Sequence, residues 1–142
     1  MDPAIIRYYR RLLREGFAYA GSFENPSIYL TYDNSRGTLC GNAGDNLHLY
    51  IDIRNGVIER MRYLCVCDPT TNVAVEALCI LAEHKTLEEA KSLKEEAFSR
   101  LVECTGDEFL KKSRIVIEYL TQEIAKFENS QTGERRPLQP RK

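Results

Sequence analysis

The feature that most constrains this chain is a pair of strand-like stretches joined by Asn55-Gly56. Between residues 46 and 54 apolar and polar side chains alternate, with four apolar ones on one side: Leu47, Leu49, Ile51 and Ile53. An alternation of period two is typical of a strand with one buried face. Because Asn-Gly is favoured in two-residue hairpin turns, we expect residues 57–66 to return beside the first strand.

A helix start follows the second strand directly. Asp68 is suited to accept hydrogen bonds from the unpaired amides of a first helical turn, and Pro69 has no amide hydrogen to lose there. Residues 70–83 are apolar on nearly every side, which predicts a buried central helix. Cys67 therefore lies immediately before a helix N-terminus.

Other segments predict further elements on either side of this unit. Residues 4–15 have an amphipathic pattern, and the side expected to pack on the core carries Ile5, Tyr9, Leu12 and Leu13. Residues 27–32 are typical of a short strand. A capping box at residues 86–89 predicts a helix that runs toward Cys104. A final amphipathic helix is expected at residues 113–127, after a break at residues 105–107.

Charge gives no general indication of a partner. The chain has 20 basic and 21 acidic residues, so bulk electrostatics does not favour nucleic acid or an anionic membrane. The first helix nevertheless carries a row of basic side chains opposite its apolar stripe: Arg7, Arg10, Arg11 and Arg14. This row is either a solvated surface or a surface for an acidic partner.

Length and composition predict one folded domain. The chain has 142 residues, of which 43% are hydrophobic and 29% charged. We expect residues 1–129 to form the domain and residues 130–142, which are basic and poor in apolar residues, to form a disordered tail. No stretch reaches the roughly 20 apolar residues that span a bilayer. The N-terminal residues lack the features of a signal peptide, so we expect a cytoplasmic protein.

The five cysteines are the clearest candidates for chemistry. In a reducing compartment they should remain thiols, which favours metal binding or reactivity over a disulfide framework. Cys40 in a glycine-rich turn and Cys67 before a helix are plausible metal ligands, because amides and the helix dipole stabilise thiolates. Each is equally consistent with a small buried apolar residue. Asp45 is a hard oxygen ligand beside them or the cap of a turn.

The other thiols are weaker candidates. Cys65 and Cys67 should point to one side of the strand, but their spacing is neither that of zinc knuckles nor that of thioredoxin-like sites. A thiol-redox pair is the remaining interpretation of these two. Cys79 is expected to be structural, and Cys104 stays undecided. The sequence contains no Ser-His-Asp set, phosphate-binding loop or HExxH motif, so we do not expect an enzyme.

Several short stretches are similar to one known family. They are Phe23-Glu24-Asn25-Pro26, Cys40-Gly41 with Asp45, Gly56-Val57-Ile58-Glu59, the Cys67 region and Lys85-Thr86-Leu87-Glu88-Glu89-Ala90. In these stretches, which span most of residues 4–127, the chain resembles the U-type iron-sulfur cluster assembly scaffolds, the NifU N-terminal-like or IscU family. The last stretch is the most specific, since these scaffolds have a similar run after the central helix.

The resemblance implies a fold, a site and partners. The fold is α+β, a three-stranded antiparallel sheet with helices packed on it. The site is a set of three cysteines and an aspartate that holds a transient iron-sulfur cluster or zinc. By position, Cys40 and Cys67 match two of the cysteines, and Asp45 matches the aspartate. The partners implied are a cysteine desulfurase and recipient apo-proteins.

The chain departs from the family pattern at three places. Asp45 matches only if residues 42–44 are an insertion, and an ungapped alignment places Asp68 where the family has the second cysteine. Lys112-Ser113 stands where the family has His-Cys. The leading hypothesis is a scaffold that binds iron and sulfide, or a transition metal, through Cys40, Asp45 and Cys67, with Cys65 or Cys104 as fourth ligand. The alternative is a divergent protein-interaction module with the same fold and no cluster.

Overall fold

The structure is a computed structural model that describes residues 1–33 and 46–141, with side chains up to Gln131. Its sheet has three antiparallel strands in the order β1-β2-β3. The strands are β1 (Ile28–Asp33), β2 (Asn46–Arg54) and β3 (Val57–Val66), and the helices are α1 (Pro3–Glu15), α2 (Pro69–Ala82), α3 (Leu87–Lys91), α4 (Glu95–Val102) and α5 (Asp107–Arg141). The described part of the chain thus has the α+β architecture, a three-stranded antiparallel sheet with helices packed on it.

The β2–β3 hairpin confirms the prediction from the alternating sequence. Asn55 and Gly56 have φ angles of 55° and 74°, the left-handed conformation that a tight two-residue turn requires. The ladder pairs Leu49 with Tyr63 and Ile51 with Met61, and it shifts register between Asp52 and Ile53. Because of this irregularity, Ile53 is only half-buried, while the other three apolar residues of the alternation are buried.

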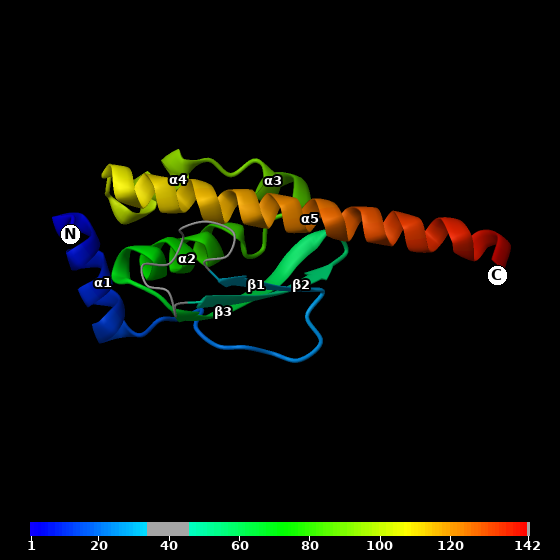
Figure 1. The fold of residues 1–142 in the computed structure, drawn as a ribbon, viewed down its shortest axis with the longest axis horizontal. Helices are drawn as coiled ribbons and strands as arrows, with labels where there is room; N and C mark the ends of the chain where they lie inside the picture. The colour runs from blue at the N-terminus through cyan, green and yellow to red at the C-terminus, as the bar shows by residue number, and fades with distance from the viewer. Residues whose placement is uncertain (34–45, 142) are drawn as a thin grey trace.

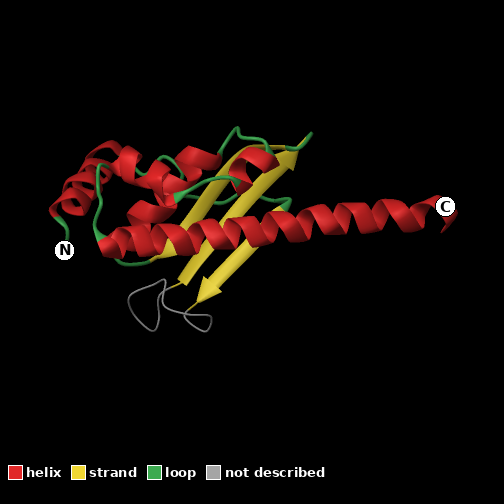
Figure 2. Ribbon diagram, turned by 90° about the horizontal axis from the view of Figure 1, so that it is seen from above, coloured by secondary structure: helices red, strands yellow, loops and turns green. Residues whose placement is uncertain are grey.

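Helix α2 lies at the centre of the molecule. It contacts β3 and all four other helices, and α5 also contacts β1. Figures 1 and 2 show α2 and α5 over one face of the sheet, with α1 beside α2 at one end of the molecule. Most of α2 is inaccessible to solvent, as expected for a helix that is apolar on nearly every side. Its N-terminus is also as predicted, because the Asp68 side chain accepts a hydrogen bond of 2.7 Å from the Thr71 amide.

The connection from α1 to β1 runs along the other face of the sheet (Figure 1). It first pairs with the outer edge of β3: the Gly21 amide donates to the Tyr63 carbonyl at 2.8 Å, and the Tyr63 amide donates to the Tyr19 carbonyl at 3.0 Å. Phe23 then packs against the Tyr50 ring and beneath the Arg60 guanidinium. The segment therefore closes one sheet edge and covers part of the far face.

The helix predicted from the capping box toward Cys104 is two helices. The capping box at Thr86 is present, but α3 ends at Lys91 and α4 begins only at Glu95. At the break the Ser92 hydroxyl donates to the Glu88 carbonyl at 2.9 Å, and the Ser92 amide donates to Glu89 at three-residue spacing. These bonds compete with the continuing helical pattern, so the single-helix prediction was wrong.

Two other helices differ in detail from the prediction. In α1 the buried side chains are those of Ala4, Ile5, Tyr8 and Leu12, so the helix is rotated and Leu13 is 60% exposed. Helix α5 begins at Asp107 rather than at residue 113. Two acidic residues in its first turn interact favourably with the helix dipole and stabilise this earlier start. The amphipathic pattern of this helix predicts burial of Val116, Leu120, Ile124 and Phe127; the first three are buried, whereas Phe127 is only half-buried. The prediction that residues 130–142 form a disordered tail stays a prediction.

Candidate metal and thiol site

The junction between β3 and α2 holds the cysteines that the sequence singles out. Cys65 lies near the end of β3, Val66 is its last residue, and Cys67 follows it directly. Both cysteines are half-buried, whereas Val66 between them is 58% exposed. Cys67 Sγ lies 3.6 Å from the carbonyl oxygen of Asn46 at the start of β2. The site is therefore at one end of the sheet and within reach of solvent.

Cys65 and Cys67 are joined in a disulfide. Their Cα atoms are 5.5 Å apart, within the roughly 4.4–6.8 Å that such bonds allow. The expectation that all cysteines remain thiols is therefore wrong for these two. The metal-ligand prediction applies to them only in the reduced form, because metals bind the thiolate.

Asp68 links the junction to α5 and Lys112. While one oxygen of Asp68 caps α2, Oδ2 lies 4.0 Å from Nζ of Lys112, whose side chain is only 5% exposed. Lys112 Nζ also lies 3.6 Å from Glu108 on the same helix. The ion pair brings two segments that are far apart in the sequence together, the end of β3 and the first turns of α5.

Ser113 takes no part in this ion pair. It is fully buried, and its hydroxyl donates a hydrogen bond of 2.9 Å to the Phe109 carbonyl one turn earlier in α5. A serine hydroxyl stays protonated near neutral pH and binds soft metals poorly. Ser113 is therefore satisfied within its own helix.

The described thiols outside the disulfide are both buried. Cys79 lies in the middle of α2, where burial raises the pKa of its thiol far above the ordinary value. Cys104 lies between α4 and α5, and burial also raises the pKa of its thiol. A hydrogen bond from the Gly106 backbone lowers that pKa, but by less than burial raises it. Both shifts disfavour the thiolate that metals bind, which agrees with a structural role for Cys79.

The predicted ligand set cannot be assembled from the described residues alone. Cys40 and Asp45 lie outside them, so the predicted approach of Cys40 to Cys67 stays a prediction. Within the described ranges 1–33 and 46–141, no group of three or more histidine, cysteine, aspartate or glutamate side chains is placed to hold a metal ion. The structure does bring Cys65, Cys67, Asp68 and Lys112 together at one junction.

A buried polar link between α2 and β3 was not predicted. The Tyr63 hydroxyl donates to Glu76 Oε1 at 2.8 Å, and the amides of Ala18 and Tyr19 also donate to this carboxylate. Burial is the main reason that the pKa values of both Tyr63 and Glu76 are raised. The sequence signal was the polar stripe of α2, in which Asn72, Glu76, Cys79 and Glu83 recur at helical spacing.

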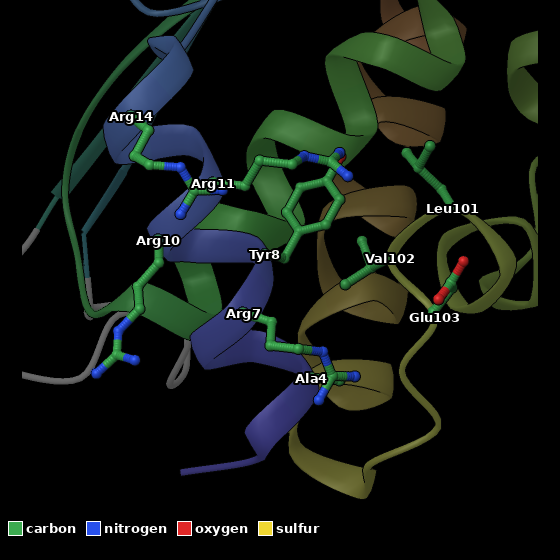
Figure 3. A pocket seen from close by; sticks show the side chains of 9 residues that line it. All are labelled: Ala4, Arg7, Tyr8, Arg10, Arg11, Arg14, Leu101, Val102 and Glu103. Carbon is green, nitrogen blue, oxygen red and sulfur yellow. The ribbon is translucent and has the colours of Figure 1, made fainter.

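A separate groove follows the arginine row of α1. It has a volume of about 460 Å³ and lies between α1 and the end of α4; its lining includes four arginines, the exposed Glu103 and an apolar floor formed by Ala4, Tyr8, Leu101 and Val102. Figure 3 shows Arg7 and Arg11 extending toward α4, whereas Arg10 points away from it. The Arg11 guanidinium lies 4.4 Å from the centre of the Tyr8 ring, which holds it at the groove.

Comparison with known proteins places the fold. No family model matches the sequence, and no curated protein matches it. Among solved structures, the chain is similar to a nitrogen-fixing NifU-like protein (N-terminal) from Brucella abortus, with a TM-score of 0.61 and 12% identity over 90% of this chain and 94% of that one. It is also similar to a putative iron-sulfur cluster assembly scaffold protein for the SUF system from Fervidobacterium islandicum AW-1. That match has a TM-score of 0.60 and 13% identity over 87% of this chain and 96% of the other.

At this level of identity the likeness concerns the backbone. The α+β fold, a three-stranded antiparallel sheet with helices, is thus similar to that of both proteins over nearly their whole length. In the described part of the chain, no helix has the length and apolarity to cross a membrane. The chain has the fold of the NifU/IscU-type scaffolds.

Proposed function

We propose that this chain is an iron-sulfur cluster assembly scaffold or carrier. Its reduced form binds iron and sulfide through Cys40, Asp45 and Cys67, with Cys65 or Cys104 as fourth ligand. Thiolates are the ligands that iron-sulfur clusters prefer, and an aspartate ligand binds more weakly, which keeps a cluster labile enough to pass on. The chain acts in the cytoplasm as a carrier rather than as an enzyme.

The observation that supports this proposal most is the meeting of two segments at the β3–α2 junction. The resemblance assigns ligands to the Cys67 region and to the start of the last helix, and the Asp68–Lys112 ion pair joins these segments. Lys112 brings a positive charge to the place where the family has a histidine. That charge is balanced by Asp68 and Glu108, so it does not by itself prevent binding of iron by Cys67.

The partners follow from the same resemblance. A cysteine desulfurase supplies sulfur, and apo-proteins that need a cluster receive the assembled cluster.

Zinc is the alternative metal for the same donors, because it also prefers sulfur and tolerates an aspartate oxygen.

Anaerobic reconstitution tests the proposal directly. The full chain, reduced with dithiothreitol and supplied with ferrous iron and sulfide, should develop sulfide-to-iron absorption bands, with iron and sulfide in equal amounts by chemical analysis. Cys40→Ser and Cys67→Ser should lose most of this iron. Cys79→Ser is the matched control, since Cys79 is buried in α2, and it should keep the iron.

Two results would count against a scaffold. If the wild-type protein holds no more iron and sulfide than Cys40→Ser does, it does not assemble a cluster at these residues. A colourless protein that binds zinc through Cys40 and Cys67 would keep the metal site and remove the assembly role. Ser113→Cys adds a further measurement, because a thiol there raises iron content only if the side chain turns away from the Phe109 carbonyl toward the junction.

The second candidate function is a protein-interaction module, and the arginine groove favours it. The chain is close to neutral overall, yet four of its arginines line this one groove beside a single glutamate. The floor between Arg7 and Arg11 is apolar. Such a surface fits an acidic segment of a partner that also carries an apolar side chain.

A labelled acidic peptide tests this candidate with a matched pair of variants. Arg7→Glu should weaken binding of a fluorescein-labelled peptide of glutamate and leucine by about tenfold, a loss of about 1.4 kcal/mol. Arg54→Glu makes the same charge change at an exposed arginine at the end of β2 that does not line the groove, so it should weaken binding much less. Binding should also fall between about 0.1 M and about 1 M salt. Equal losses in the two variants, or no binding at low salt, would reject this candidate.

A further inference from the structure

The Cys65–Cys67 pair is set apart from the other described cysteines by its position. Cys79 is fully buried and Cys104 is 2% exposed, so neither presents a sulfur to a reagent in solution. Cys65 and Cys67 are half-buried on either side of the exposed Val66. Cys65 is fixed within the strand ladder opposite Leu47, and Cys67 lies just beyond the last ladder pair.

The disulfide defines what this pair can donate. Two thiols become a disulfide by giving up two electrons and two protons. Because the Cα atoms are held 5.5 Å apart by the end of the strand, the two sulfurs meet without any rearrangement of distant elements. A reaction between groups held in this way competes well with reactions between separate molecules. The reduced pair is therefore a built-in two-electron donor.

We infer that the reduced pair converts sulfane sulfur into sulfide. The sulfur in a cluster is at the sulfide level, whereas the outer sulfur of a persulfide is more oxidised by two electrons. The inference rests on the proposed function, which requires sulfide at this junction. The substrate class is a persulfide or an inorganic polysulfide that can reach Cys67 beside the exposed Val66.

The proposed reaction has two steps. In the first, the Cys67 thiolate attacks the outer sulfur of the donor, its bond to the donor breaks, and the donor leaves as a thiolate. Cys67 then carries a persulfide. In the second, the Cys65 thiolate attacks Sγ of Cys67, the Cys65–Cys67 disulfide forms, and the outer sulfur leaves as hydrosulfide with the bonding electron pair. The two cysteine sulfurs are oxidised, the transferred sulfur is reduced by two electrons, and a dithiol reductant restores the pair.

Inorganic disulfide, HSS⁻, is the probe that tests this reaction on the full, reduced, metal-free chain. It transfers one sulfur atom and leaves only hydrosulfide. Wild type should release twice as much hydrosulfide per Cys67 as Cys65→Ser does, and peptide mass spectrometry should find the Cys65–Cys67 disulfide. Cys65→Ser should stop at the first step, with one extra sulfur atom on Cys67. Cys79→Ser is the matched control, since Cys79 is fully buried in α2, and it should behave as wild type.

Two outcomes with the reduced chain would overturn the inference. One is an equal release of hydrosulfide by wild type and Cys65→Ser, and the other is a lasting persulfide on Cys67 in wild type with Cys65 still reduced. The pre-oxidised chain should take up no sulfur at either residue, and uptake there would also contradict the inference.

The assay is independent of cluster binding because no iron is present. Reconstitution with ready-made sulfide bypasses the sulfur reduction and tests the scaffold alone. A chain that fails in the HSS⁻ assay but gains iron and sulfide in reconstitution refutes this inference and keeps the proposed function. The opposite combination refutes the scaffold and keeps the sulfur chemistry.

Discussion

At the scale of single residues, Asp68 has two structural roles that its place in the sequence shows only in part. One oxygen accepts from the Thr71 amide and caps α2, which the Asp-Pro start predicts. The other faces the buried Lys112, a contact that no local pattern indicates. Loss of the side chain therefore leaves an uncapped helix and a lysine with less negative charge around it.

Two substitutions at this position separate the roles. Asp68→Ala removes both the cap and the ion pair, and it should lower the free energy of unfolding by more than the roughly 0.5–2 kcal/mol of a lost cap. Asp68→Asn keeps a side-chain oxygen for the Thr71 amide and removes only the charge, so it should cost less. Urea unfolding followed by circular dichroism measures both.

The same two proteins test whether Asp68 is a metal ligand, as the ungapped alignment permits. In that case both substitutions reduce iron content far more than they reduce the stability of the metal-free protein.

Equal destabilisation by Asp68→Ala and Asp68→Asn would mean that the ion pair, and not the cap, dominates the stability contribution of this residue.

At the scale of elements, α2 and β3 are joined by polar groups inside an apolar interface. Tyr63 on β3 donates to Glu76 on α2. Glu83, which follows the last residue of α2, accepts from the Met61 amide at 3.1 Å and pairs with Arg62 at 3.0 Å. Buried polar groups of this kind fix one arrangement of helix on strand, because a shift would leave them unsatisfied.

The raised pKa of Glu76 predicts a pH dependence of stability. A carboxyl group that holds its proton more tightly in the folded state destabilises the fold as the pH rises above the ordinary value of 4.5. The folded state then has to ionise a buried group that the unfolded chain ionises easily. Each tenfold difference in proton affinity between the two states is worth about 1.4 kcal/mol.

Glu76→Gln removes this contribution, and comparison of two pH values isolates it. Between about pH 4 and about pH 8, wild type should lose more unfolding free energy than the variant, because only wild type ionises the buried group. Gln has one side-chain oxygen where Glu has two, so the variant also loses one hydrogen-bond acceptor. That loss changes the free energy of unfolding by the same amount at both pH values and cancels in the comparison. Glu96→Gln, on the exposed side of α4, is the control and should follow wild type. A constant difference between wild type and Glu76→Gln would contradict the interpretation.

At the scale of the whole molecule, the sequence predicts what local patterns determine. The hairpin at Asn55-Gly56 and the start of α2 depend on neighbouring residues, and the structure contains both. Resemblance to known scaffolds predicts the sheet and its helical layer, which the solved structures share. The break at Ser92 was missed because hydrogen bonds within a few residues competed with a longer apolar pattern. The early start of α5 was missed because its first turn is marked by acidic residues and not by apolar periodicity.

The site could be predicted only in outline. Cys67 was singled out by its place before a helix, but its bond to Cys65 depends on how the end of β3 turns, which spacing does not give. The approach of Lys112 to Asp68 depends on how α5 packs on α2. The Asp68–Lys112 contact joins residues far apart in the chain, and one sequence contains no local signal for it.

The segment that pairs with the outer edge of β3 has a consequence for association between molecules. A strand with unpaired backbone groups is a template on which another chain can add a strand and start aggregation. The hydrogen bonds between Tyr63 and residues 19 and 21 occupy that template in the middle of β3. Residues 17–21 thus protect this edge of the sheet against self-association, and a chain shortened past them would lose that protection.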